Sequence, residues 1–165
     1  MADLGLSFQG LQQEMASIVA SDLGPSLAVE TSLLYQIWKG SGGDTRIWFS
    51  RFNGSSWTVQ QSLPDPIRTS ASPGLAALVT SAENGEPSSQ LWAAWKSEGS
   101  DNSIYFSIYD GAWSEQTQIV LPNSPTVKTT NSPALASFGG LLYFVWKGSP
   151  DDGIYWTYFN PSTAV

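Results

Sequence analysis

Hydrophobic and polar residues alternate in short runs along this chain, and the same series of runs returns three times. One run occupies residues 34–40, 91–97 and 142–148. It is rich in aromatic and β-branched residues, and its next-to-last residue is a lysine. A second run follows it at residues 46–52, 103–109 and 153–159. Runs of this length and composition, bounded by turn residues, are typical of β-strands. Their recurrence indicates a fold built from copies of one supersecondary unit.

Two further runs belong to the repeat. A short one begins at Trp57 and Trp113, and another starts beside Pro25, Pro73 and Pro133. The dipeptides Asn53-Gly54 and Asp110-Gly111 stand before the short run, and such dipeptides close tight hairpins because they accept a positive φ. Each repeat is therefore predicted to form four antiparallel strands, which we call inner, second, third and outer in chain order.

Four antiparallel strands in a unit of about 40–50 residues form the blade of a β-propeller. We predict an all-β chain with a single β-propeller domain over residues 1–165. Its three four-stranded blades are expected at approximately 24–63, 72–121 and 132–160. Both faces of the second and third strands are largely apolar, so each blade is expected to lie between neighbours. Trp38, Trp95 and Trp146 are accordingly predicted to belong to the core between blades.

The two ends of the chain each hold part of a blade. No outer strand can follow residue 159 in the third repeat, but Phe8 and the glutamines after it echo the outer run of 57–61. We expect residues 6–13 to be an outer strand that closes a blade with the C-terminal strands of a partner chain. A helix in this region is the alternative interpretation.

Three blades are too few for a ring, since propellers have about 4–8 blades. Two copies would supply six, and a two-fold dimer is the commonest closed assembly. We therefore predict a homodimer that forms a six-bladed ring. The alternative is that the chain is a fragment of a longer propeller.

Composition removes several classes of function. The formal net charge of −7 disfavours nucleic acid and anionic membranes as partners. The chain has no cysteine and no histidine, so it lacks a thiol nucleophile, a thiolate metal site and the commonest general base. Met1-Ala2-Asp3 begins no signal peptide, and no apolar stretch is long enough for membrane insertion. We expect a protein that is cytoplasmic or released without a signal peptide.

Candidate chemistry gathers in the loops between the second and third strands. In each loop an aspartate stands five positions after a lysine, and an aromatic residue follows. A sugar needs a fork of donors and acceptors for its hydroxyls and an aromatic platform for its C–H face, which this pattern provides. The predicted sugar-binding residues are Lys39, Asp44, Arg46, Trp48, Lys96, Asp101, Tyr105, Lys147, Asp152 and Tyr155.

Two other interpretations of these loops stay open. Each lysine can pair with its aspartate merely to order the loop. Calcium is a weaker alternative, because no loop has the ligand spacing of an EF-hand. We predict neither a metal nor a cofactor.

The repeat resembles the blades of fungal and bacterial β-propeller lectins. The resemblance covers nearly the whole chain and rests on Trp-Lys-Gly at 38–40 and 146–148, the Ile-aromatic pairs of the third strands and the Asn/Asp-Gly turns. In that family sugars sit in pockets between neighbouring blades, and some members are built from chains that carry only part of the ring. The resemblance implies a multivalent, non-catalytic lectin with glycans as partners.

One mark of the fucose-binding branch is present in a single blade. There an arginine precedes each Ile-aromatic pair, whereas here only Arg46 does so and Ser103 and Gly153 stand at the other two positions. The sugar therefore stays unnamed.

Propellers can also be enzymes, and sialidases are the nearest rival. A sialidase-like site resembles three arginines that converge from different blades, but Arg46, Arg51 and Arg68 all belong to one repeat. Paired-carboxylate hydrolysis needs two carboxyl groups that flank one bond, whereas Asp151 and Asp152 are sequence neighbours. We predict that the chain is not an enzyme. A protein-binding propeller scaffold and, less favoured, a sialidase-like glycoside hydrolase are the alternatives.

Overall fold

The computed structural model describes residues 13–15, 19–81, 87–122 and 127–163. Over these ranges the secondary structure consists of β-strands and one short 3-10 helix, η1 (Pro161–Thr163), which confirms the predicted all-β class. The described residues contain no helix with the length and apolar character needed to span a membrane. The outer strand predicted for residues 6–13 lies, apart from Gln13, outside the described residues.

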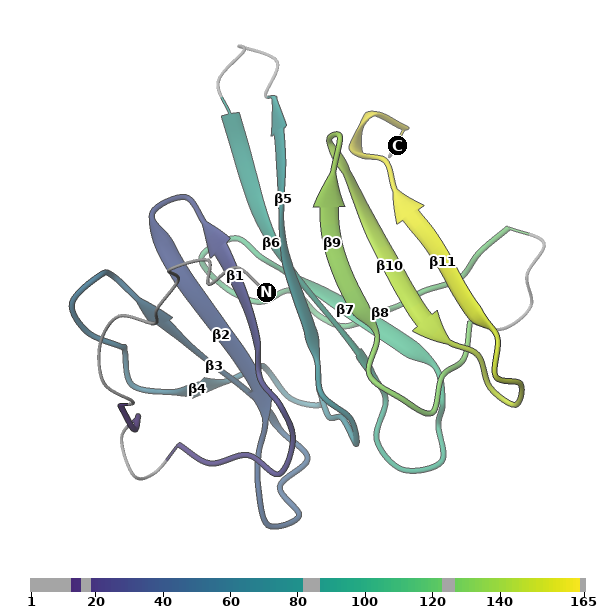
Figure 1. Cartoon of the computed structure of the whole chain (residues 1–165), viewed down its shortest axis with the longest axis horizontal. Helices are drawn as coiled ribbons and strands as arrows, with labels where there is room; N and C mark the ends of the chain where they lie inside the picture. Colours follow the sequence, from purple (N-terminus) through teal and green to yellow (C-terminus); the bar gives the residue numbers. More distant parts are fainter. Residues whose placement is uncertain (1–12, 16–18, 82–86, 123–126, 164–165) are drawn as a thin grey trace, which may run out of the picture.

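The strands form three antiparallel sheets, each with its strands side by side in chain order (Figure 1). The first blade holds β1 (Ser26–Glu30), β2 (Leu33–Lys39), β3 (Ile47–Phe52) and β4 (Gln61–Ser62). The second blade holds β5 (Gly74–Ser81), β6 (Pro87–Lys96), β7 (Ile104–Tyr109) and β8 (Thr117–Gln118). The third blade holds β9 (Ala134–Phe138), β10 (Leu141–Lys147) and β11 (Ile154–Phe159).

The outer strands are shorter than the sequence predicts. Trp57 and Trp113 make only isolated bridges, and the regular strands β4 and β8 begin later. The regular strand begins late because a side chain takes the place of a backbone partner: the Thr58 hydroxyl accepts the backbone N–H of Arg51 at 3.1 Å. Ser114 does the same in the second blade. A hydroxyl that replaces a ladder partner interrupts the regular strand.

Two apolar clusters hold the blades together. In one, Ile37 and Phe49 of the first blade pack with Trp95 of the second blade. In the other, Ile104 of the second blade packs with Trp146 of the third. The middle blade is thus covered on both faces, which is why its strands can be apolar on both sides.

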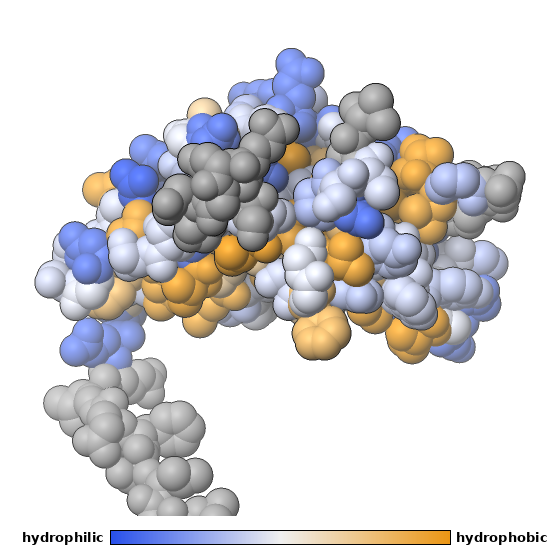
Figure 2. Space-filling model, turned by 90° about the horizontal axis from the view of Figure 1, so that it is seen from above, coloured by the Kyte–Doolittle hydropathy of each residue, from blue (hydrophilic) through white to orange (hydrophobic). Residues whose placement is uncertain are grey.

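The inner strands β1, β5 and β9 contact one another in that order. Figure 2 shows the resulting shape from above, an arch with hydrophobic residues gathered along its concave side. The arch places the three loops between second and third strands at one end of the blades, which we call the rim.

Candidate functional site

The rim loops repeat one backbone geometry. Each loop is closed by a hydrogen bond from the residue after the lysine to the residue before the third strand: Gly40 N to Arg46 O at 3.0 Å, Ser97 N to Ser103 O at 3.0 Å, and Gly148 N to Gly153 O at 2.7 Å. A Cβ on Gly40 would collide with the Asp44 carboxylate, and one on Gly148 would collide with the Asp151 carboxylate. The glycines therefore make room for an acidic side chain folded back onto its own loop.

That acidic side chain has the same partners in all three blades. It accepts the backbone N–H two residues later and the polar hydrogen of the aromatic side chain four residues later. The aromatic partners are Trp48 for Asp44 at 2.9 Å, Tyr105 for Asp101 at 3.4 Å, and Tyr155 for Asp151 at 2.9 Å. The backbone partners are Arg46, Ser103 and Gly153, at 3.0, 2.9 and 3.0 Å.

In the third blade the residue with this role is Asp151, and not the predicted Asp152. Counting from the lysine selects Asp152, because the third loop is one residue shorter between its lysine and the folded-back carboxylate. Counting back four positions from the aromatic residue would have found Asp151, and this spacing is the signal that sequence reasoning missed. Asp152 instead lies at the surface, where it pairs with Lys147.

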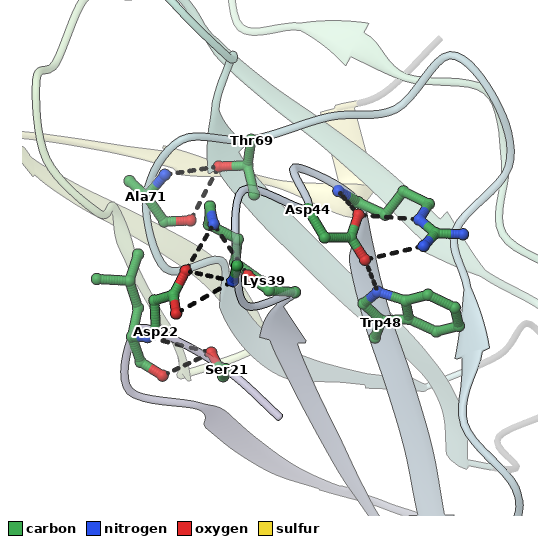
Figure 3. A network of polar contacts seen from close by, with 11 residues as sticks. Ser21, Asp22, Lys39, Asp44, Trp48, Thr69 and Ala71 are labelled. Atoms are coloured by element: carbon green, nitrogen blue, oxygen red, sulfur yellow. Dashed lines mark hydrogen bonds and ion pairs between the residues drawn. The ribbon is translucent and has the colours of Figure 1, made fainter. Parts of the chain in front are cut away.

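The first blade differs from the others through Arg46. Its Nε lies 2.9 Å from Asp44 Oδ1 and its second guanidinium nitrogen lies 3.0 Å from Oδ2, while Asp44 also turns toward the Trp48 indole (Figure 3). The Arg46 guanidinium holds the pKa of Asp44 well below its usual range. The same guanidinium sits 4.6 Å from the centre of the Trp48 ring and covers that face. The aromatic platform of the first blade is thus occupied by the chain itself.

The lysines do not make the uniform Lys–Asp pairs that their spacing suggests. Lys39 donates to Gly40 O at 2.9 Å and lies 3.6 Å from Asp22, as Figure 3 shows. Lys96 is buried, and its amine donates to four oxygens, those of Ser70 Oγ, Ser97 O, Gly99 O and Asp101 O, at 2.8–3.0 Å. Burial lowers the pKa of Lys96. Only Lys147 pairs with the aspartate five positions on, at 2.8 Å.

These contacts give Lys39 and Lys96 a clear task. The Lys96 amine, within reach of four oxygens, and the Lys39 amine, held between Gly40 O and Asp22, have little capacity left for a ligand. Among the predicted residues, the structure therefore uses these two lysines internally. It turns Asp44 toward Trp48 and Asp101 toward Tyr105, while Tyr155 faces Asp151 instead of the predicted Asp152.

A cavity of about 290 Å³ opens at the rim of the third blade. Trp146 and Tyr155 form one wall as a stacked pair, 6.2 Å between ring centres and 20° between planes. Tyr155 is 44% exposed, so its ring is accessible from solvent. The cavity is lined by Lys128, Trp146, Gly148, Ser149, Pro150, Asp151 and Tyr155.

Lys128 reaches the cavity from the segment that connects the second blade to the third. That segment is tied to the second blade through the Ser103–Lys128 bridge and a 2.8 Å bond from Thr129 N to Asn102 O. The Asn102 side chain also lies 3.4 Å from Ser149 Oγ. The cavity is therefore placed where two neighbouring blades meet.

The junction of the first and second blades repeats this connection. Thr69 N donates to Thr45 O at 2.8 Å, as Thr129 does to Asn102 one blade later. Arg68 takes the sequence position of Lys128, and each precedes the inner-strand proline by the same number of residues. The sequence thus carried a signal for a basic residue over each junction, which the prediction from the rim loops alone overlooked.

Metal binding has no obvious location in the part of the chain that the structure describes. There, no group of three or more His, Cys, Asp or Glu side chains could hold an ion.

Comparison with known proteins identifies the fold. No family model and no curated protein matches the chain. Among solved structures, an Aleuria aurantia lectin mutant in complex with alpha-methyl-L-fucoside matches with a TM-score of 0.62 and 17% sequence identity over 94% of this chain and 47% of that chain. The same lectin mutant in complex with Fucalpha1-6GlcNAc matches with a TM-score of 0.61 and 16% sequence identity, over 94% of this chain and 48% of that chain.

The chain thus spans about half the length of the lectin structures that it matches. The likeness confirms the predicted β-propeller fold and, at the level of fold, the predicted resemblance to β-propeller lectins.

Proposed function

We propose that this chain is a carbohydrate-binding lectin that holds glycans at the rim, between neighbouring blades. The observation that carries the proposal is the cavity of about 290 Å³ in which an aromatic pair, a carboxylate and an amine face a common space. Sites for small polar ligands combine apolar walls with a few placed polar groups. The matching structures are of a lectin with a bound fucoside or fucosylated sugar, which supports the same class of ligand here.

The chemistry of each group suits a sugar. The exposed ring of Tyr155 offers a flat apolar surface to the C–H face of a pyranose. Asp151 accepts two hydrogen bonds from the protein, and a carboxylate has about four acceptor positions, so it can still receive sugar hydroxyls. Lys128 supplies the donors that a sugar oxygen needs.

We propose a second, related site at the junction of the first two blades, with Arg68, Asp101 and Tyr105 in the corresponding roles. Repeated weak sites on one particle strengthen attachment to a glycan-covered surface through effective concentration. In this proposal the chain acts as a homodimer, so each particle carries twice as many sites as one chain.

Binding without catalysis is the favoured form of the proposal. Hydrolysis of a glycosidic bond by paired carboxylates needs two such groups, one on each side of the bond. Among the residues that the structure describes, Asp151 is the one carboxylate that lines the cavity, and Asp152 is engaged by Lys147 outside it.

A glycan array tests the proposal. We expect binding to a defined set of saccharides, competition by the free sugar, and no release of the chromophore from chromogenic glycosides of that sugar. Binding to a protein ligand that persists after enzymatic deglycosylation would favour a protein-binding scaffold instead. Turnover of the glycoside would replace the lectin by an enzyme.

A further inference from the structure

A second cavity, of about 190 Å³, lies between the second and third blades beside the C-terminal half of β11. Its walls are almost entirely apolar. The lining residues are Trp92, Phe106, Ile119, Val120, Leu121, Phe144, Thr157, Tyr158 and Phe159.

The corresponding place between the first and second blades is filled by Trp113. This side chain is buried and packs edge-on against Phe49, with 5.7 Å between ring centres, and against Tyr109 at 5.2 Å. In the repeat, Phe106 corresponds to Phe49 and Phe159 corresponds to Tyr109. Both equivalents line the 190 Å³ cavity. The cavity is therefore the position that the aromatic residue of a fourth strand occupies one blade earlier.

The edge of β11 beside this cavity also lacks, among the described residues, the hydrogen bonds that an outer strand makes in the other two blades. In the second blade, Ser107 Oγ donates to Ser114 O at 2.8 Å, and Ser114 N donates to Ile108 O at 2.9 Å. The first blade has the same bonds at Ser50 and Arg51. Thr157 and Tyr158 are the equivalents in β11, and no described strand pairs with that edge.

We propose that this cavity and the open edge of β11 form a socket for residues 6–13 of a second copy of the chain, with Phe8 in the place that Trp113 holds one blade earlier. An extended segment that adds to a sheet edge gains affinity from main-chain hydrogen bonds and specificity from a side-chain pocket. The proposal concerns self-association and stands independently of glycan binding.

The free faces at the two ends of the arch favour a second copy as the occupant. The outward face of the third blade exposes Ile154, Trp156 and Tyr158 at 71%, 62% and 50%. In the first two blades the equivalents of Ile154 and Trp156 pack against the next blade: Ile47 and Phe49 in the first, Ile104 and Phe106 in the second. At the opposite end of the arch, β1 exposes Leu27 at 56%, whereas its equivalent in the second blade, Leu75, is buried. The free face of the third blade and the free face of the first blade therefore correspond to the two sides of the blade-to-blade contact that the chain already makes twice.

The course of the chain at its start agrees with this assignment. Met15 and Val19 line a cavity of about 230 Å³ together with Trp38 and Gln36 of the first blade. Trp38 is not part of the cluster that joins the first blade to the second. Met15 and Val19 therefore lie against the face of the first blade on which a preceding blade would stand.

Cysteine cross-linking tests the socket directly, since the chain has no cysteine of its own. We would prepare Phe8→Cys and Val120→Cys as separate proteins, mix them and oxidise them. Val120 lines the cavity and is 74% exposed, so it is accessible without disturbing the core. We expect mass spectrometry to identify a disulfide between the two variants. Val59→Cys is the matched control, at 78% exposure in the outer segment of the first blade.

Equal yields with Val59→Cys would overturn the proposal, as would a linkage that forms only when both cysteines are in one chain. Light scattering gives a second readout. We expect twice 17.8 kDa for the wild-type chain and for Val59→Trp, but 17.8 kDa for Val120→Trp, whose ring fills the cavity. An unchanged doubled mass in Val120→Trp, or a wild-type mass of 17.8 kDa, would contradict the socket. Retained glycan binding by the smaller species would separate this outcome from failure of the lectin proposal.

Discussion

The Tyr155 hydroxyl donates a 2.9 Å hydrogen bond to Asp151, four residues earlier on the same rim loop. This bond raises the pKa of Tyr155, so the phenol stays protonated and continues to donate at any physiological pH. It also fixes an exposed ring against Trp146 before any ligand arrives. A ring held in advance loses little conformational entropy on binding.

Replacing Asp151 by asparagine should weaken glycan binding strongly. An amide has one acceptor oxygen where the carboxylate has two, so asparagine cannot accept from both the Gly153 N–H and the Tyr155 hydroxyl and has less acceptor capacity left for sugar hydroxyls. We expect the Kd to rise at least tenfold, equivalent to about 1.4 kcal/mol. Isothermal titration with the sugar identified on the array measures this. Asp152→Asn is the control and should stay within about twofold of wild type, because its carboxylate pairs with Lys147 instead. A larger rise in Kd with Asp152→Asn than with Asp151→Asn would assign the sugar-binding role to Asp152.

Removing the guanidinium that covers Trp48 should open a further site. In Arg46→Ser the first blade acquires the residue that the second blade has at this position, Ser103. We expect the number of sugars bound per chain to increase in a calorimetric titration, while Arg51→Ser, within β3 and away from Trp48, leaves it unchanged. A loss of binding in Arg46→Ser would instead place Arg46 among the sugar ligands.

Lys96 should be a stability residue. In Lys96→Met the four oxygens around the amine lose their donor in a buried place, which we expect to cost about 1–3 kcal/mol in the free energy of unfolding. Lys147→Met removes an exposed ion pair and should cost less than about 1 kcal/mol. Urea unfolding followed by tryptophan fluorescence measures both. Equal costs would contradict the assignment of Lys96 to loop order.

The Asp44–Arg46 pair should make stability depend on pH in one direction. Because the folded pKa of Asp44 is lowered, its contribution is complete above the unfolded value of about 3.9 and declines as the pH falls below it. The difference in urea midpoint between wild type and Asp44→Asn should therefore be constant from pH 7 to about pH 4 and shrink toward pH 2. A difference that is the same at pH 2 as at pH 7 would show that packing, rather than charge, carries the effect.

The fold could be predicted because the repeat is regular where backbone geometry demands it. Gly54 and Gly111 have φ values of 95° and 77°, so the turn dipeptides marked real hairpins. The alternating apolar residues of β2, β6 and β10 marked strands, and those of the middle blade are covered on both faces. The outer strands were less predictable, because Thr58 and Ser114 replace ladder contacts by their hydroxyls and this depends on tertiary position.

The rim was predicted less fully. In the first two loops the lysine spacing selects Asp44 and Asp101, the carboxylates that turn toward the aromatic residues, whereas in the third loop it points to Asp152. The part of these residues in sugar binding stays a prediction. The spacing failed because Lys96 binds carbonyl oxygens and Lys39 binds Gly40 O and Asp22, so neither lysine sets the position of the carboxylate in its own loop. The prediction from the rim loops left out Lys128 because this residue reaches the cavity from the connection between blades. Its spacing to Pro133, which matches that of Arg68 to Pro73, is the pattern that marks it.

The open edge of β11 has a consequence for handling the protein. In the part of the chain that the structure describes, no strand pairs with the outer edge of β11, and Trp156 and Tyr158 of the same strand are exposed. Such an edge is a template on which any extended chain can add. If the proposed dimer forms, dilution that separates its two copies would expose this edge and produce a species prone to precipitate. Preparations kept concentrated should stay clear longer than dilute ones, the reverse of the usual behaviour of an aggregating protein.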